Sequence, residues 1–506
     1  MPSALPVIPG GAAPLASAPD YDLVVIGGGI NGVGIANDAA GRGLKVALIE
    51  RDDLAQATSS ASTKLIHGGL RYLEYYAFRL VREALQEREV LSNKVPHLVR
   101  PLRLVLPLGQ VGGRPRPAWM VRLGLWLYDH LAAHPNFPAT RTLKLSRGPQ
   151  GAPLHDEFRQ GFEFSDATVD DSRLVIANAM QAREGGADIF TRSAVTGAVR
   201  DADHWVISRS NGADLTARVL VNAAGPWVRD ILDHLDRPGP DVRLVQGSHI
   251  VVPRLYDGDH AYLLQQDDGR VVFVIPYQDG FSLIGTTEVL LAEAQDPPTV
   301  SEAEIEYLVT AVGRYFKEPP VPNDIVWQFA GIRPLFDEDD DDPKAFSREY
   351  HLHLDADDGP ALLSVYGGKI TTYRPLAEKV LAALKPYLPA HGPAWTVDTP
   401  LPGAEHNADM DGDLHLPDGL LASLLARHGS RTAELLRDCQ GMEDLGVNFG
   451  GHLYALEIDY FMDREWACSG EDVLWRRSKL GLFLNEEQRN AVTKYVADRR
   501  ARVVRF

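Results

Sequence analysis

The sequence contains very little cysteine. Only Cys439 and Cys468 occur among 506 residues, and neither belongs to a CxxC pair or lies beside paired histidines. A disulfide framework or a structural zinc site needs several such ligands at short spacings. We therefore expect no disulfide-stabilised fold and no metal site, and the composition favours a reducing, cytoplasmic setting.

Long apolar runs are also missing. No stretch of about 18 consecutive apolar residues occurs, so a membrane-spanning helix is not expected. Residues 1–19 are rich in proline, alanine and glycine, and they lack the basic start and the continuous apolar segment of a secretory signal. We interpret them as a flexible tail.

Basic residues are fewer than acidic ones, and the formal net charge is -18. Such a chain repels a polyphosphate backbone, which argues against a nucleic-acid partner. The apolar content of 45% and the charged content of 24% are typical of folded proteins. Because 506 residues exceed the size of one hydrophobic core, we expect about two or three domains.

The folded region opens with the pattern of a βαβ unit. Residues 22–29 form a β-rich stretch that ends in glycines, and residues 29–43 have the small and apolar spacing of a helix. Residues 44–50 have the composition of a second buried strand. The unit predicts a nucleotide-binding domain of the Rossmann type.

The first turn of this unit has the G-x-G-x-x-G spacing at Gly27, Gly29 and Gly32. Glycines there permit a tight turn, and the helix that follows presents backbone amides to a pyrophosphate. Glu50 ends the second strand, where a carboxylate accepts hydrogen bonds from ribose hydroxyls and repels a 2′-phosphate. The pattern predicts a dinucleotide site that disfavours NADP, and it leaves NAD and FAD open.

Alternating helix and strand patterns return twice further along the chain. Between them, apolar alternation from about 244 to 330 indicates an antiparallel sheet, and the chain beyond a proline-rich junction is predicted to be helical. We expect an α/β fold in which a Rossmann-like domain is interleaved with an antiparallel-sheet substrate domain and followed by a helical domain. The expected bounds are 20–96, 150–243 and 325–385 for the first domain, 97–149 and 244–324 for the second, and 393–506 for the third.

Polar segments follow the second strand of the βαβ unit. The hydroxyls and amides of residues 58–60 suit a phosphate cradle, although an ordinary polar loop has the same composition. Residues 62–73 then gather Lys64, His67, Arg71 and Tyr72 around a glycine pair that permits close approach of a planar ligand. The pattern of residues 75–93 predicts a helix, which Pro96 ends.

Seven segments of the chain occur in a characteristic order: IGGGINGVGIANDAAGRG, TSSASTKLIHGGLRYLE, VNAAGPWV, GSHIVVP, IGTTE, GIRPL and YGGKITTYR. Together they resemble the FAD-dependent glycerol-3-phosphate dehydrogenases, which belong to the glycine/D-amino-acid-oxidase-like flavoproteins. The resemblance implies FAD as the cofactor and oxidation of sn-glycerol 3-phosphate to dihydroxyacetone phosphate, with a hydride passing from substrate C2 to flavin N5. It further implies electron transfer to ubiquinone or menaquinone, and a homodimer.

The same resemblance implies a set of cofactor contacts, which makes the first domain an FAD-binding domain. Reduced flavin gathers negative charge near N1, and the lysine and the helix start within GGKITT suit that charge. The implied cofactor-binding residues are Gly27, Gly28, Gly29, Asn31, Gly32, Glu50, Thr58, Ser59, Ser60, Ser62, Lys64, Leu65, His67, Gly225, Gly368, Lys369, Ile370 and Thr371.

A phosphate dianion favours planar, permanently charged donors. The substrate-binding residues that the resemblance implies are Arg71, Tyr72, Thr287, Arg333, Arg348 and Lys369, and Arg333 is also assigned to catalysis. A surface ion pair is the alternative for each arginine, most of all for Arg348, which follows the acidic run 337–342. Glu288 stands where the family pattern often has aspartate, which leaves its role open.

Removal of the C2 hydroxyl proton requires a base, and two histidines are candidates. His67 lies in the HGG turn expected beside the flavin, and His249 begins a strand of the substrate-side sheet. We favour His67 slightly. A packed structural role is the alternative for either histidine, above all for His249.

Residues 100–128 reverse the charge of the chain. The segment has no acidic residue and interleaves Trp119, Trp126 and Tyr128 with five arginines: Arg100, Arg103, Arg114, Arg116 and Arg122. Arginines attract anionic headgroups and aromatic rings favour the interface, so the segment predicts peripheral attachment to the inner face of the cell membrane. An interdomain helix with buried tryptophans is the alternative.

Other functions remain open at this level. A glycerol-3-phosphate oxidase would use the same pocket and pass electrons to oxygen. An amine or amino-acid oxidase is disfavoured because a carboxylate needs fewer cations than a phosphate dianion. A non-catalytic flavin-binding, membrane-associated protein would leave the arginine, histidine and lysine motifs unexplained.

Overall fold

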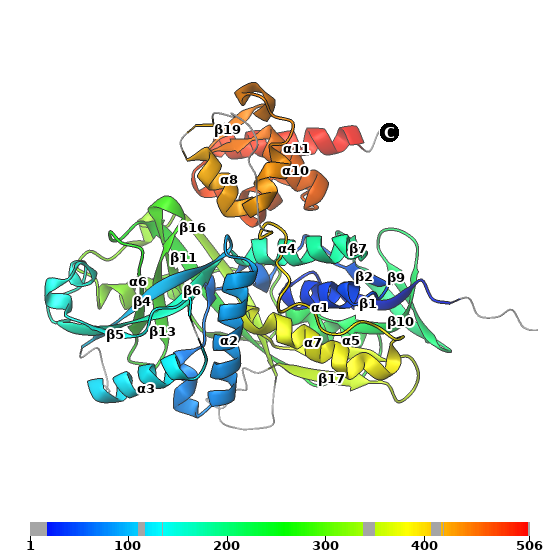
Figure 1. Cartoon of the computed structure of the whole chain (residues 1–506), viewed down its shortest axis with the longest axis horizontal. Coiled ribbons are helices and arrows are strands. Elements are labelled where there is room, and N and C mark those ends of the chain that lie inside the picture. The colour runs from blue at the N-terminus through cyan, green and yellow to red at the C-terminus, as the bar shows by residue number, and fades with distance from the viewer. Residues whose placement is uncertain are drawn as a thin grey trace, which may run out of the picture.

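The computed structural model describes residues 18–109, 117–133, 135–336, 350–405, 416–417 and 419–503. It contains a mainly parallel sheet covered by helices, a mainly antiparallel sheet beside it, and a cluster of helices near the C-terminus (Figure 1). The predicted α/β fold with two interleaved sheets and an added helical domain is therefore confirmed.

The first sheet has eight strands and includes the βαβ unit. Five neighbouring strands run parallel, in the order β18-β10-β1-β2-β7, and β17 pairs antiparallel with β18 at one edge. The strands are β1 (Tyr21–Ile26), β2 (Val46–Ile49), β7 (Asp188–Phe190), β8 (Val195–Asp201), β9 (His204–Arg209), β10 (Leu215–Asn222), β17 (His351–Asp355) and β18 (Leu362–Tyr366).

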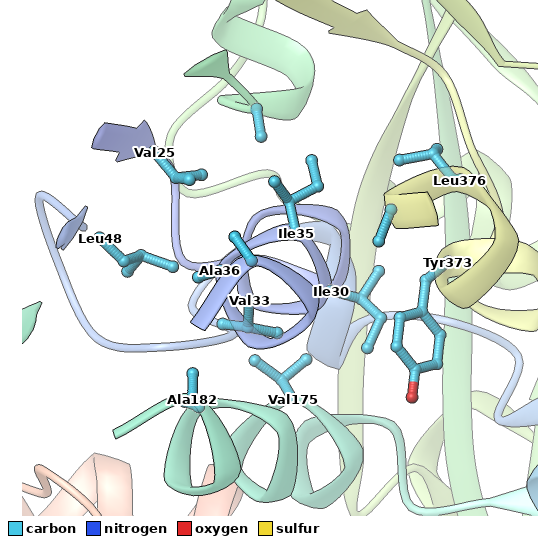
Figure 2. Packing of buried hydrophobic residues seen from close by; sticks show 14 of the residues in the cluster. Val25, Ile30, Val33, Ile35, Ala36, Leu48, Val175, Ala182, Tyr373 and Leu376 are labelled. Atoms are coloured by element: carbon cyan, nitrogen blue, oxygen red, sulfur yellow. The ribbon is translucent and has the colours of Figure 1, made fainter. Parts of the chain in front are cut away.

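Helix α1 (Ile30–Gly41) connects β1 to β2 and lies between two other helices. Figure 2 shows Val175 and Ala182 of α4 (Asp171–Glu184) on one side of α1, and Tyr373 and Leu376 of α7 (Tyr373–Leu384) on another. Gly34 permits this approach, since a β-carbon there would lie 2.7 Å from the Tyr373 ring. The buried apolar packing holds the N-terminus of α1 at the strand ends, where the glycine turn lies.

The second sheet has ten strands, and most of its pairs are antiparallel. The main order is β15-β11-β14-β13-β12-β4-β6-β3, with β16 on β11 and β5 on β6. The strands are β3 (Leu65–Ile66), β4 (Val99–Leu108), β5 (Arg141–Leu143), β6 (Gln160–Val169), β11 (Val242–Pro253), β12 (Ala261–Gln265), β13 (Val271–Tyr277), β14 (Phe281–Gly285), β15 (Val289–Leu291) and β16 (Trp327–Phe336). The other helices of the two sheet regions are α2 (Phe78–Lys94), α3 (Ala118–His130), α5 (Val228–His234) and α6 (Glu302–Gly313).

Two strands belong to the second sheet, although the expected domain boundaries assigned them to the FAD-binding domain. β6 and β16 fall within 150–243 and 325–385, which were expected in the FAD-binding domain, but β6 pairs with β4 along its whole length and β16 pairs with β11. Their partners are distant in sequence, and alternating apolar residues do not specify which sheet a strand joins. The helix predicted over 75–93 is α2.

Helix α3 has an exposed apolar face. Trp119 is 66% exposed, Leu123 49% and Trp126 53%. Two residues counted toward the membrane segment do not contribute to this face: Tyr128 is buried, and Arg103 pairs with Glu163 at 3.0 Å. The membrane-attachment prediction for residues 100–128 is therefore narrowed to α3. Arg114 and Arg116 lie outside the described residues.

The C-terminal part has a core of its own. Its helices are α8 (Leu420–His428), α9 (Thr432–Leu435), α10 (Ala455–Arg464), α11 (Glu486–Val503) and a π-helix at Asp472–Arg477, with a short hairpin of β19 (Asn448–Gly450) and β20 (Leu453–Tyr454). The buried residues Leu453, Ile458, Phe461 and Val492 belong to one apolar cluster. Among the described residues, no helix is long and apolar enough to cross a membrane.

Candidate active site

The glycine turn at the end of β1 allows three elements to meet. Gly27 has a φ of +108°, and a β-carbon there would lie 2.5 Å from the carbonyl oxygen of Ala223 at the end of β10. A β-carbon on Gly32 would collide with the carbonyl oxygen of Gly27. Only glycine therefore lets the chain turn from β1 into α1 this closely.

Glu50 fixes the shape of the loop that follows β2. Its carboxylate accepts hydrogen bonds from the Gly28 N–H at 2.6 Å and from the Asp52 N–H at 2.8 Å. Burial raises the pKa of Glu50, and the two N–H donors oppose that shift. Each carboxylate oxygen retains acceptor capacity toward the cavity, as a ribose diol requires.

A single cavity of about 1410 Å³ runs from this turn to the space between the two sheets. Its lining brings together residues that are more than 300 positions apart in the chain. The predicted residues that line it are Gly27, Gly29, Asn31, Glu50, Thr58, Ser59, Ser62, Leu65, His67, Arg71, Tyr72, Gly225, His249, Arg333, Gly368, Lys369, Ile370 and Thr371.

The cavity offers polar groups suited to a dinucleotide. The Ile30 N–H donates to Ser59 Oγ at 2.9 Å, which brings the Ser/Thr loop beside the start of α1. Asn31 donates to the Gly367 carbonyl at 3.1 Å, while its Oδ1 is buried without a partner among the described residues. A glycine cradle, a ribose-binding carboxylate and an unsatisfied buried amide oxygen fit an FAD molecule lying along this wall.

Four predicted cofactor residues support the site from behind and do not line the cavity. Gly28 and Gly32 shape the turn, and Ser60 Oγ donates to the Ala57 carbonyl at 3.3 Å. Lys64 is buried, pairs with Asp171 at 2.7 Å and donates to the Ser60 carbonyl at 2.8 Å. The structure therefore places these four residues behind the cavity wall, and their contact with the cofactor stays a prediction.

Thr287 was predicted to bind substrate, but the structure does not place it among the residues that line the cavity. Its hydroxyl is buried, donates to Glu304 at 2.7 Å and accepts the Ser248 N–H at 2.9 Å. Its neighbour Thr286 lines the cavity and accepts a hydrogen bond from Arg333 at 3.2 Å. Both threonines belong to the IGTTE motif, so the motif located the position but did not distinguish the two hydroxyls.

Cations from three parts of the chain line the cavity. Lys369 lies over the Tyr72 ring at 3.9 Å, and Arg333 lies 3.6 Å from Glu288. Gly247 leaves room for Arg333, because a β-carbon there would collide with the guanidinium. Arg348 lies outside the described residues.

Arg270, which the sequence patterns did not indicate, also lines the cavity and pairs with Asp268 at 2.6 Å. The only signal was a basic residue in the turn before the apolar strand β13. Such turns commonly carry exposed charges, so the pattern alone does not indicate a ligand contact.

His249 is held rigidly in the wall of the cavity. Nε2 lies 3.0 Å from Thr63 Oγ1, and the ring stacks on Phe329 with centroids 5.0 Å apart. Burial, with a smaller contribution from Lys64 and Arg333, holds the pKa of His249 well below its usual range. A β-carbon on Gly285 would collide with the imidazole, so this glycine makes space for it.

His67 lines the same cavity from the HGG turn. The Gly68 N–H donates to the Tyr128 oxygen at 2.8 Å, and the Tyr128 hydroxyl donates to Asp166 at 2.6 Å. The turn is therefore anchored to α3 through buried polar groups. The geometry brings both candidate histidines to the cavity.

Two family models match this sequence. The model described as FAD dependent oxidoreductase matches residues 22–374, and the model described as C-terminal domain of alpha-glycerophosphate oxidase matches residues 394–504. The chain therefore belongs to the FAD-dependent oxidoreductase family, and FAD is its cofactor. The cavity that includes the dinucleotide turn is the candidate site for this cofactor.

The chain is similar to several known members of this family. The chain is 52% identical to a glycerol-3-phosphate dehydrogenase of Pseudomonas aeruginosa, with 96% of each chain covered. It is 48% identical to a D-erythritol 1-phosphate dehydrogenase of Brucella abortus, covering 94% of this chain and 97% of that one. The structure of the glycerol-3-phosphate dehydrogenase from Bacillus halodurans, complexed with FAD, shares the fold with a TM-score of 0.69 at 24% identity, covering 94% and 93% of the two chains.

Proposed function

We propose that this protein oxidises sn-glycerol 3-phosphate to dihydroxyacetone phosphate. The observation that carries the proposal is the placement of Arg71, Arg270, Arg333 and Lys369 on the same cavity as the dinucleotide turn. A phosphate dianion requires several fixed cations, whereas an amino-acid carboxylate requires fewer. The relative from Pseudomonas aeruginosa, at 52% identity, supports the same substrate.

His249 is the proposed base. Its lowered pKa keeps the imidazole neutral at neutral pH, so that it can accept the proton of the C2 hydroxyl. Thr63 fixes the orientation of the ring, and Arg333 lies close enough to contribute to the pKa shift. We prefer His249 to His67 because its contacts define one orientation, and His67 stays the alternative.

When bound, FAD would supply the hydride acceptor at flavin N5. The protein would provide positive charge to balance the negative charge that develops on reduction. Lys369 and the amides at the start of the helical turn Ile370–Thr372, which leads into α7, face the cavity. These groups make the reduced cofactor more stable and thereby favour substrate oxidation.

One anaerobic experiment tests this function. The purified holoprotein is mixed with glycerol 3-phosphate without oxygen, and the visible flavin absorbance is followed. We expect bleaching at millimolar substrate or below, and dihydroxyacetone phosphate as the product. A flavin that stays oxidised would overturn the proposal, as would faster bleaching by D-amino acids or glycine.

A longer polyol phosphate is a second candidate substrate, because a relative at 48% identity is named for D-erythritol 1-phosphate. The same anaerobic assay separates the two candidates. The ratio of the reduction rate constants at limiting concentrations of each compound gives the relative specificity directly. A higher value for D-erythritol 1-phosphate would replace glycerol 3-phosphate in the proposal.

Quinone is the proposed electron acceptor, and α3 the proposed point of membrane attachment. The face formed by Trp119, Met120, Leu123 and Trp126 is exposed on one helix. Such a face suits the headgroup region of a bilayer, where ubiquinone or menaquinone is dissolved. We expect a water-soluble quinone to reoxidise the bleached enzyme faster than oxygen does. Rapid peroxide formation would instead indicate an oxidase.

A further inference from the structure

The π-helix of the C-terminal domain lies against the FAD-binding domain. Figure 1 shows the helical cluster above α4, and Asp472–Arg477 with the two residues that follow are among the parts of the cluster that contact the rest of the chain. Ser172, in the first turn of α4, donates from Oγ to the Arg476 carbonyl at 2.7 Å. π-Helices are rare and are frequently found at functional positions.

Two arginines of this π-helix bind one carboxylate. Arg476 Nε donates to Asp53 at 2.6 Å, and Arg477 donates to both Asp53 oxygens at 2.7 and 2.8 Å. Asp53 and Arg477 are fully buried. Burial alone would raise the pKa of Asp53, but Arg477 and Arg476 outweigh it and hold that pKa at about 2.

Asp53 lies within the loop that shapes the cofactor site. Its neighbour Asp52 donates its N–H to Glu50, and the Ala55 N–H donates to the Gly28 carbonyl at 3.1 Å. Leu54 also packs on Gly28, where a β-carbon would lie 2.8 Å from its side chain. Movement of Asp53 would therefore move both the ribose-binding carboxylate and the glycine turn.

A second set of contacts reaches the other loop that follows β2, at residues 58–64. Lys479 donates to Asp170 and Ser172 at the start of α4. The adjacent Asp171 accepts hydrogen bonds from the Ser62 hydroxyl at 2.8 Å and from Lys64. Ser62 lines the cavity, so the C-terminal domain supports both loops that follow β2.

We propose that the C-terminal helical domain is a positioning element for the cofactor site, with Arg476, Arg477 and Lys479 as the positioning residues. They hold the loops 50–55 and 58–64 in the conformation that binds the ADP part of FAD. Docking of this domain and binding of FAD are consequently coupled. The proposal depends on the FAD site alone and is independent of which substrate is oxidised.

The first test measures release of FAD from the full-length holoprotein. Flavin fluorescence rises when FAD leaves the protein, so dilution of the holoprotein gives a dissociation rate constant. Arg477→Lys keeps the charge but loses the two-pronged contact with Asp53, and we expect release to accelerate about 10-fold or more. Arg499→Ala is the matched control, because Arg499 pairs with Asp463 at 2.8 Å on the surface of the same domain.

The outcomes of this test are distinct. An unchanged release rate in Arg477→Lys would overturn the proposal, and so would equal acceleration in Arg499→Ala, which would indicate general loosening. If Arg477→Lys does not fold, Lys479→Gln is measured in the same way, with the same expected direction. The KM for substrate of the flavin-loaded fraction should stay within about 2-fold of wild type, since no positioning residue lines the cavity.

The second test uses the reciprocity of the coupling. If docking favours FAD binding, FAD binding must favour docking to the same extent. We expect amide hydrogen exchange within Asp472–Arg477 to be slower in the holoprotein than in FAD-depleted wild type, while exchange in α11 is unchanged. Equal protection of the π-helix in both states would overturn the proposal, even if the substrate assignment holds.

Discussion

Arg333 Nη2 donates a hydrogen bond to Thr286 Oγ1 at 3.2 Å, which joins β16 to the end of β14 across β11. The guanidinium also lies 3.6 Å from Glu288, so its charge is partly balanced before a ligand binds. A phosphate that enters the cavity competes with this carboxylate for the arginine.

Replacing Arg333 should weaken substrate binding without loss of FAD. We expect Arg333→Ala to raise the KM for glycerol 3-phosphate about 100-fold, since a hydrogen-bonded charge contributes about 1.5 to 3 kcal/mol. Steady-state kinetics with a soluble acceptor measures KM, and the flavin absorbance of the purified variant measures cofactor content. Arg333→Lys is the control and should recover part of the loss, whereas release of flavin would show that Arg333 supports the cofactor.

Substitutions of the two threonines of IGTTE should have different effects, one on stability and the other on KM. Thr287→Val leaves Glu304 without a donor and the Ser248 N–H without an acceptor, so the free energy of unfolding should fall by about 1 to 3 kcal/mol. Thr286→Val should instead change KM by a few-fold with little loss of stability. Urea unfolding and steady-state kinetics on both variants test this contrast. A stable Thr287→Val with a raised KM would restore Thr287 to the substrate site.

The pH dependence of turnover should identify the base. The pKa of His249 is lowered in the folded protein, so the imidazole loses its proton below the usual value of about 6.5. We expect kcat/KM to be flat from about pH 6.5 to 8 and to fall only at lower pH, where the base becomes protonated. His249→Gln should reduce kcat by at least about 100-fold and remove this limb of the profile.

His67→Gln is the matched variant for that measurement. If it abolishes the acid limb and His249→Gln retains it, His67 is the base.

A lowered histidine pKa also has a consequence for stability. The unfolded chain binds the proton more readily below about pH 6.5, so His249 lowers the free energy of unfolding as the pH falls through that range. His249→Gln should reduce this loss.

Attachment to a membrane should depend on the exposed face of α3. We expect Trp119→Ser with Trp126→Ser to reduce co-sedimentation with anionic phospholipid vesicles about 10-fold or more, because two interfacial aromatic rings are lost. Val199→Ser is the control, since Val199 is an exposed apolar residue on β8. Equal binding of the double variant and wild type would remove α3 from the proposal, and anaerobic reduction by substrate should be unaffected.

Much of the cofactor site could be predicted from local sequence. Gly27, Gly32 and Glu50 lie within one βαβ unit, and the steric need for glycine in the turn follows from their spacing. The GGKITT segment was likewise expected at the site, and residues 367–371 line the cavity, because its glycines and helix start are neighbours in the chain. Local rules suffice where the interacting groups are close in sequence.

Other assignments depended on packing. Lys64 was predicted to contact the cofactor, but Asp171, more than 100 residues later, holds it in the interior. Motif position did not distinguish Thr286 from Thr287, since the buried Glu304 takes one hydroxyl and leaves the other to the cavity. The only local signal for Arg270 was a basic residue in a turn, which does not indicate a ligand contact.

The sequence by itself determined the dinucleotide turn and the type of each domain, because these follow from short-range sterics and from apolar periodicity. It indicated the family through the seven ordered segments that resemble known members. Only the tertiary structure decided which polar side chains face the cavity and which are satisfied in the interior. It also brought Arg477 to Asp53, across 424 positions of the chain. Such a contact depends on how two separately packed cores meet, and no local pattern of residues encodes that arrangement.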